Sequence, residues 1–211
     1  MRQYLRLSLL TSGFLVFLIS CKSYQIPDAQ LVKNEKTSLE NNYFSTSEDQ
    51  VYKCQIEVYK KHISGIVIIK KLNDSTHRVA ITSDFGNKMI DFEISENDFK
   101  LNYVLSDLDK KIIINLLKND FRILLKKDFL ISETFDNKEF KIYTSEKNKE
   151  KYYLFVDREN QLLKKMVYTK NNKEKMDFSF DAKKHIFADS VNLQHKDYKI
   201  NIKLFQITET D

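Results

Sequence analysis

Histidine is the side chain best suited to bind a metal or move a proton near neutral pH, and this chain has four: His62, His77, His185 and His195. None of them has a metal-ligand spacing to another histidine, to a cysteine or to an acid. His195 falls on the apolar side of an alternating segment, where a core or rim position is more typical than a ligand. The histidines therefore predict no metal site.

Motifs for nucleophilic or phosphate chemistry are also missing from the sequence. There is no Gly-x-Ser-x-Gly elbow, and only Gly65 and Gly86 occur after residue 20, too few for a glycine-rich phosphate loop. Asp107 and Asp109 could act as a carboxylate pair, but Ser106-Asp107-Leu108-Asp109 is more typical of a helix capping box. The sequence thus predicts a protein that is not an enzyme and uses no cofactor.

Cys21 has the clearest chemical context in the chain. It ends the run Leu18-Ile19-Ser20-Cys21, directly after an apolar segment, Leu7–Ile19, that follows Arg2 and Arg6. This layout is typical of a secretory signal peptide over residues 1–20. The apolar segment has 13 residues, fewer than the ~20 needed to cross a bilayer. The alternative is an ordinary secreted protein in which Cys21 has no special role.

The run before Cys21 resembles the lipobox of bacterial lipoproteins, with Leu at −3, Ser at −1 and Cys at +1. This resemblance implies cleavage before Cys21, a diacylglycerol on its sulfur and acylation of the new amino terminus. Two or three acyl chains hold a protein stably on a membrane, whereas a single chain does so only marginally. The covalent lipid on Cys21 would be the only non-protein group.

Composition indicates one soluble domain behind this anchor. Removal of residues 1–20 would leave 191 residues and lower the net charge from +5 to +3, with both signs interspersed. No basic block stands out, so nucleic acid is an improbable partner. Cys54 would be the only cysteine besides Cys21 and lies on the apolar side of an alternating segment. It is expected to be a small buried residue rather than a reactive thiol.

The sequence divides at about residue 50. Residues 21–50 are polar and weakly periodic, which predicts a flexible tether with a short helix around 28–35. Residues 51–211 alternate with period two in about ten or eleven segments, and residues 112–125 carry an apolar stripe at helical spacing. The predicted fold is mainly β (α+β): a curved antiparallel sheet, with the helix inserted midway and packed in the concavity.

Three strand-like segments and the last hairpin carry a family resemblance. They are residues 64–70 (SGIVIIK), 78–86 (RVAITSDFG), 89–94 (MIDFEI) and 191–207. In order and pattern they resemble the half-barrel family of lipoprotein-localisation proteins, the outer-membrane receptors (LolB) more than the soluble carriers (LolA). The resemblance covers residues 52–207 and implies a half-barrel that holds acyl chains. The chain departs from these receptors in having no Trp, one Pro and a long tether.

The resemblance also implies a function and a location. The protein would bind the acyl chains of lipoproteins, receive them from a LolA-type periplasmic carrier and place them in the outer membrane. Phe85, just before the turn residue Gly86, matches the residue that enters membrane lipid in the receptors; the alternative is that it folds back over the core. The position after Cys21 is Lys22 rather than the Asp typical of inner-membrane retention. By analogy we expect the protein at the outer membrane, facing the periplasm.

The candidate lining of the cavity follows from the apolar faces of these segments. The candidates are Ile68, Ile81, Ile90, Phe92, Leu101, Leu117 and Phe121. An open cavity of several hundred cubic ångströms would favour lipid transfer. A filled core would favour a structural or scaffolding lipoprotein of the same fold, and a general carrier of hydrophobic ligands is a third possibility.

Overall fold

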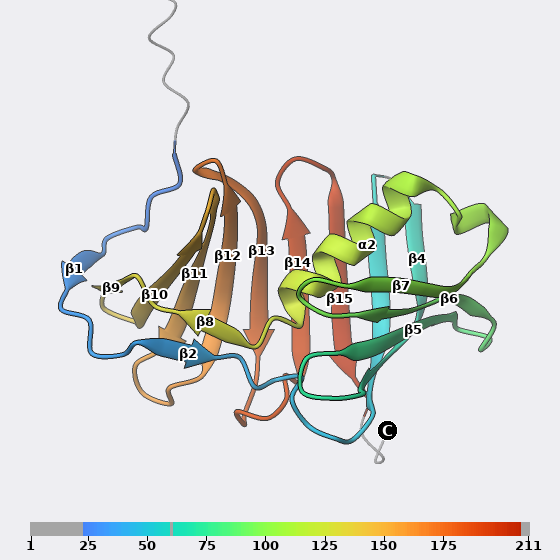
Figure 1. The fold of residues 1–211 in the computed structure, drawn as a ribbon, viewed down its shortest axis with the longest axis horizontal. Coiled ribbons are helices and arrows are strands. Elements are labelled where there is room, and N and C mark those ends of the chain that lie inside the picture. The colour runs from blue at the N-terminus through green and yellow to red at the C-terminus, as the bar shows by residue number, and fades with distance from the viewer. Residues whose placement is uncertain (1–22, 60, 208–211) are drawn as a thin grey trace, which may run out of the picture.

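The protein folds around one large, curved antiparallel sheet (Figure 1). The computed structural model describes residues 23–59 and 61–207, so Cys21 and the predicted signal peptide lie outside the described residues. In this part of the chain the large sheet has 13 strands, and a separate pair is formed by β2 (Ser38–Glu40) and β8 (Asp128–Leu130). The strands of the large sheet, in chain order, are β1 (Gln30–Val32), β3 (Gln50–Val58), β4 (Lys61–Lys71), β5 (His77–Ser83), β6 (Lys88–Ile94), β7 (Phe99–Val104), β9 (Glu133–Asp136), β10 (Phe140–Lys147), β11 (Glu150–Asp157), β12 (Leu163–Lys170), β13 (Lys173–Asp181), β14 (Ser190–His195) and β15 (Ile200–Gln206).

One long-range pairing joins two runs of hairpin-connected strands into a continuous sheet. The spatial order is β1-β9-β10-β11-β12-β13-β14-β15-β3-β4-β5-β6-β7. Strand β15 pairs with β3, with Ile202 opposite Ile56, so the last strand lies beside the first long strand. The edge strands β1 and β7 have no pairing with each other among the described residues, so the sheet curves without closing. This open, curved sheet is the architecture that the sequence predicts.

The strand number differs from the expected ten or eleven. All eleven of the longer strands lie where alternation predicts them, but the large sheet has 13 because β1 and β9 join its edge. Strands β1, β2, β8 and β9 are only three or four residues long. Such segments are too short to display a period of two, which explains why the sequence did not reveal them.

Part of the predicted tether is packed into the domain. Residues 30–32 form strand β1 on the edge of the large sheet, where a helix was expected, and residues 38–40 form β2. Tyr43 and Phe44 are buried, and the Tyr43 hydroxyl donates a hydrogen bond to the Leu163 carbonyl at 2.9 Å. The prediction of a flexible tether is therefore wrong for residues 30–50, because these short strands and aromatic side chains find partners far along the chain.

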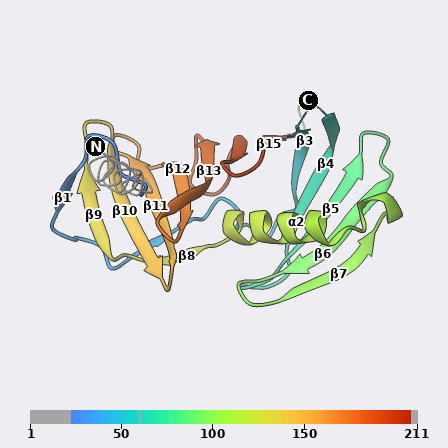
Figure 2. The ribbon, with the colours of Figure 1, turned by 90° about the horizontal axis from the view of Figure 1, so that it is seen from above.

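The long helix α2 (Lys111–Leu124) crosses the concave side of the sheet between its two wings (Figure 2). Its buried side chains include Leu117, Phe121 and Leu124, as the apolar stripe predicts. The predicted capping box is wrong, because residues 106–108 form a separate 3-10 turn and Lys110, without a side-chain cap, precedes α2. Phe121 packs edge-on against Phe92 of the sheet with ring centroids 5.5 Å apart, which fixes the helix over β6.

Candidate functional site

A groove runs between α2 and the concave face of the sheet. Its volume is about 1700 Å³. Strands β3, β5, β6, β13 and β15 and the helix supply most of its apolar lining. These side chains are Ile56, Val58, Ile81, Ile90, Ile94, Ile113, Leu116, Leu117, Phe121, Met176, Ile200 and Ile202. A groove of this size with an aliphatic lining suits the hydrocarbon part of a ligand.

Strand register places these residues on one face. Ile56 is opposite Ile202 across the β3–β15 pair, and Ile81 is opposite Ile90 across β5–β6. Because successive side chains of a strand point to opposite faces, alternate residues of each strand share the concave surface. The period-two alternation of the sequence is thus the direct cause of an apolar inner face.

The predicted lining residues fall into three groups. Ile81, Ile90, Leu117 and Phe121 line the groove. Phe92 and Leu101 lie on the same face but belong to the core beneath α2, so they do not line it.

The prediction that Ile68 lines the groove is wrong, because its side chain lies on the opposite face of β4. Val67 is opposite the groove residue Ile81, and Val67 and Ile69 are the buried residues of this strand. Residues 66–69 are all apolar, so the sequence alone does not show which alternate positions face inward.

The groove opens near the start of α2, and its mouth carries exposed apolar and cationic side chains. Tyr59, Ile112 and Tyr198 are at least half exposed. Lys61 and Lys110 also line this part of the groove. The backbone N–H of Tyr59 donates to the carbonyl of Lys199 at 2.7 Å, which holds the β3–β4 and β14–β15 turns together.

Phe85 lies in the turn between β5 and β6 and is 93% exposed. The alternative position, folded back over the core, is therefore not adopted. Gly86 has φ +81°, a conformation that side chains rarely adopt, so this glycine allows the tight turn that exposes its neighbour. The Ser64 hydroxyl donates to the Asp84 carboxylate and fixes the turn beside Ile63, which lines the groove.

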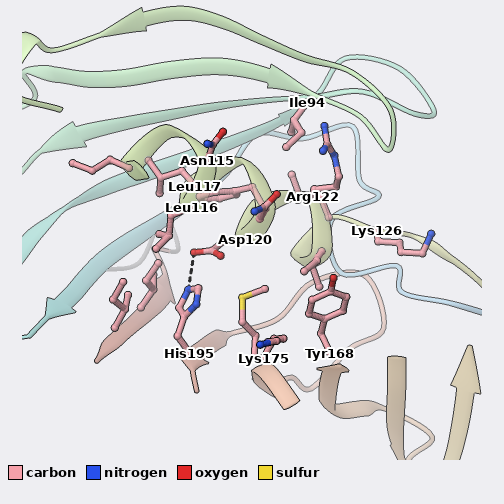
Figure 3. A pocket seen from close by; sticks show the side chains of 18 of the residues that line it. Ile94, Asn115, Leu116, Leu117, Asp120, Arg122, Lys126, Tyr168, Lys175 and His195 are labelled. Atoms are coloured by element: carbon pink, nitrogen blue, oxygen red, sulfur yellow. Dashed lines mark hydrogen bonds and ion pairs between the residues drawn. The ribbon is translucent and has the colours of Figure 1, made fainter. Parts of the chain in front are cut away.

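Polar side chains also line the groove, and two of them form a buried pair. Asp120 of α2 and His195 of β14 share a hydrogen bond of 3.1 Å between Oδ2 and Nε2 (Figure 3). Burial raises the pKa of the Asp120 carboxyl, and the hydrogen bond to His195 opposes this shift. Asp120 was not predicted from the sequence motifs, although an acid within the apolar stripe of a helix indicates a special environment.

The other titratable groups singled out in the sequence lie apart from this pair. Cys54 is buried in the core, and burial raises the pKa of its thiol to about 12, as an unreactive thiol requires. His77 is bound at 2.8 Å to the Phe44 carbonyl, whereas His62 and His185 are exposed. Over residues 23–59 and 61–207 no three His, Cys, Asp or Glu side chains gather as a metal site would require. No helix in the described ranges is long and apolar enough to cross a membrane.

Comparison with known proteins gives a fold likeness only. No protein-family model matches the chain, and no curated protein matches its sequence. A LolA superfamily protein from Nitrosomonas europaea superposes with a TM-score of 0.54 and 8% identity, covering 80% of this chain and 87% of that one. This chain therefore has a LolA-like fold.

Two further solved structures superpose less closely. A DUF1329 family protein from Desulfovibrio piger has a TM-score of 0.45 and 9% identity, over 78% of this chain and 86% of that one. An outer membrane lipoprotein-sorting protein domain from Vibrio parahaemolyticus has a TM-score of 0.44 and 6% identity, over 79% and 90%.

Proposed function

We propose that this protein is a lipid-anchored envelope protein that binds the acyl chains of lipoproteins and helps to place them in the outer membrane. The observation that carries the proposal is the groove of about 1700 Å³, lined by aliphatic side chains on a LolA-like fold. The superposed protein is a member of the LolA superfamily, which agrees with the family resemblance of the sequence.

The groove supplies the affinity that acyl binding needs. Transfer of each methylene group from water to an apolar surface contributes about 0.8 kcal/mol, so a long chain binds strongly without any charged contact. Exchange between a carrier and this protein then occurs between two apolar surfaces. Such a step has a small net free energy and requires no nucleotide or ion gradient.

The mouth of the groove is suited to contact with a lipid surface. The exposed side chains Tyr59, Ile112 and Tyr198 can enter the interfacial region, and the lysines beside them favour anionic headgroups. Phe85 extends from a turn next to groove-lining Ile63. A lipid anchor on Cys21 would hold the mouth near the membrane, with a LolA-type carrier delivering cargo from the periplasm.

The rival function is a scaffold of the same fold with a filled core. The volume and aliphatic lining of the groove favour binding over this rival. A general carrier of hydrophobic ligands would use the same groove, and only ligand preference separates it from a lipoprotein receptor.

Binding of fluorescent lipopeptides to residues 22–211, a segment that contains every strand of both sheets and α2, tests the proposal. We expect saturable binding that prefers a triacylated over a monoacylated probe. Equal binding of the two would support the general carrier. Absence of binding by a protein with a cooperative unfolding transition would overturn the proposal in favour of a scaffold.

A further inference from the structure

The buried side of α2 contains one charged residue among apolar ones. Its other buried residues are Leu117, Phe121, Ile123 and Leu124, whereas Asp120 is 1% exposed. Asp120 Oδ2 is hydrogen-bonded to His195, but Asp120 Oδ1 is buried with no hydrogen-bond partner among the described residues. A buried carboxylate oxygen without a donor is destabilising, so its retention inside a groove points to a ligand.

In the described part of the chain no donor lies within hydrogen-bond distance of this oxygen. Leu116 and Leu117 flank Asp120 on the helix (Figure 3). Met176 lies opposite His195 across β13–β14, and the Tyr198 ring is 6.2 Å from the His195 ring. Asp120 and His195 themselves line the groove. A hydrocarbon chain laid along this stretch would cover the pair and leave Oδ1 unsatisfied.

We propose that Asp120, held by His195, is a hydrogen-bond site for the polar group of the ligand, and that the groove selects an amphiphile with an amide N–H or hydroxyl beside its acyl chains. This inference rests on the proposed lipid-binding function of the groove. The acylated amino terminus of a lipoprotein carries such an amide N–H between its chains and its peptide. The site would therefore distinguish lipoprotein-like ligands from lipids that lack a donor.

The assignment requires that the proton of the pair lie on His195 or on Asp120 Oδ2 and not on Oδ1, where it would make Oδ1 a donor. If the shared proton is on His195, both oxygens of Asp120 are acceptors; if it is on Oδ2, Oδ1 is still an acceptor. His195 fixes the direction of the carboxylate and is a positioning residue. A ligand with a carboxylate at this point would instead face an acceptor and bind poorly.

The test uses two fluorescent fatty amides with the same chain, one with an N–H and one N-methylated so that it has no donor. We expect residues 22–211 to bind the N–H probe about tenfold more tightly, the effect of one buried hydrogen bond. Asp120→Leu should abolish this preference and improve binding of the N-methyl probe. Lys118→Leu, a change on the same helix but outside the groove lining, should leave the preference unchanged.

The outcomes distinguish the hydrogen-bond site at Asp120 from the lipid-binding function of the groove. Equal binding of both probes by the unmodified protein, or a preference that survives Asp120→Leu, overturns the hydrogen-bond site and leaves the lipid-binding groove intact. Failure of the folded protein to bind either amide probe or the triacylated probe overturns both. Asp120→Asn, which nearly preserves shape, serves if Asp120→Leu does not fold, and its weaker acceptor should reduce the preference.

Discussion

At the scale of single residues, Gly65 lies where the sheet leaves no room for a side chain. A Cβ atom at this position would be 2.0 Å from the carbonyl oxygen of Thr82 on the neighbouring strand. A side chain therefore requires β4 and β5 to separate. We expect Gly65→Ala to lower the free energy of unfolding by about 2–4 kcal/mol, measured by urea denaturation.

Gly86→Ala is the matched control for this prediction, because it separates lack of space from backbone strain. No atom lies within 4 Å of a Cβ at Gly86, but its φ is +81°. Gly86→Ala should lower the free energy of unfolding only by the strain of the left-handed conformation, about 1–2 kcal/mol. Equal destabilisation by the two substitutions would contradict the argument from space.

Asp91 should make the protein less stable in acid. Arg78 donates two hydrogen bonds to its carboxylate, at 2.9 and 2.7 Å, and this lowers the pKa of Asp91 to about 2. The unfolded chain has the ordinary pKa of about 3.9, so the ion pair stabilises fully above that pH and is lost as pH falls towards 2.

The measurement for Asp91 is a difference between two proteins, which cancels the titration of other carboxylates. The advantage of the unmodified protein over Asp91→Asn should decrease by about 2 kcal/mol between pH 5 and pH 2. Urea denaturation at a series of pH values checks this. A constant difference across the range would mean that the pair has the same pKa in the folded and unfolded chains.

At the scale of elements, the length of a segment decided how well the sequence predicted it. The eleven longer strands and α2 could be recognised because each is long enough to show its period or, in β4, a continuous apolar run. The three-residue strands β1 and β2 could not, since their position depends on partners that lie about a hundred residues away, β9 and β8. The start of α2 was also misjudged, because capping motifs do not reveal a separate 3-10 turn.

The lining of the groove could also be predicted only in part from the sequence. Alternation correctly separated inner from outer residues in β5 and β6, where one face is polar. In β4 both faces are apolar, so the choice between Val67 and Ile68 needed the register of the neighbouring strands. Asp120 and His195 are 75 residues apart in the sequence, and only the packing of α2 on β14 brings them together.

A larger side chain on the groove-facing side of α2 should weaken ligand binding without unfolding the protein. Leu116 lines the groove and is only partly buried, so a larger side chain can be accommodated there by displacing ligand rather than core. We expect Leu116→Trp to weaken binding of the triacylated probe at least tenfold. Ile114→Trp, on the same helix but not in the groove lining, should bind like the unmodified protein, and a similar loss in both variants would refute the placement.

At the scale of the whole molecule, the sheet is open, and in the described part of the chain α2 and the short β2–β8 pair lie over its concave side. A groove with an exposed mouth can release a long ligand along its length. The exposed turn of Phe85 lies beside that mouth, fixed by the contact between Ser64 and Asp84. This arrangement separates two steps, holding the acyl chains in the groove and transferring them at the turn.

Phe85→Glu should therefore impair delivery but not binding. The substituted side chain remains exposed, so neither the fold nor the groove changes, but a charge cannot enter the acyl region of a bilayer as an aromatic ring can. We expect the variant to bind the triacylated probe normally and to transfer it to anionic vesicles several-fold more slowly. Leu130→Glu is the control, since Leu130 is 79% exposed in β8, away from the mouth. If both variants deliver at the rate of the unmodified protein, Phe85 does not act at the membrane; if both are slow, the effect belongs to added charge and not to this turn.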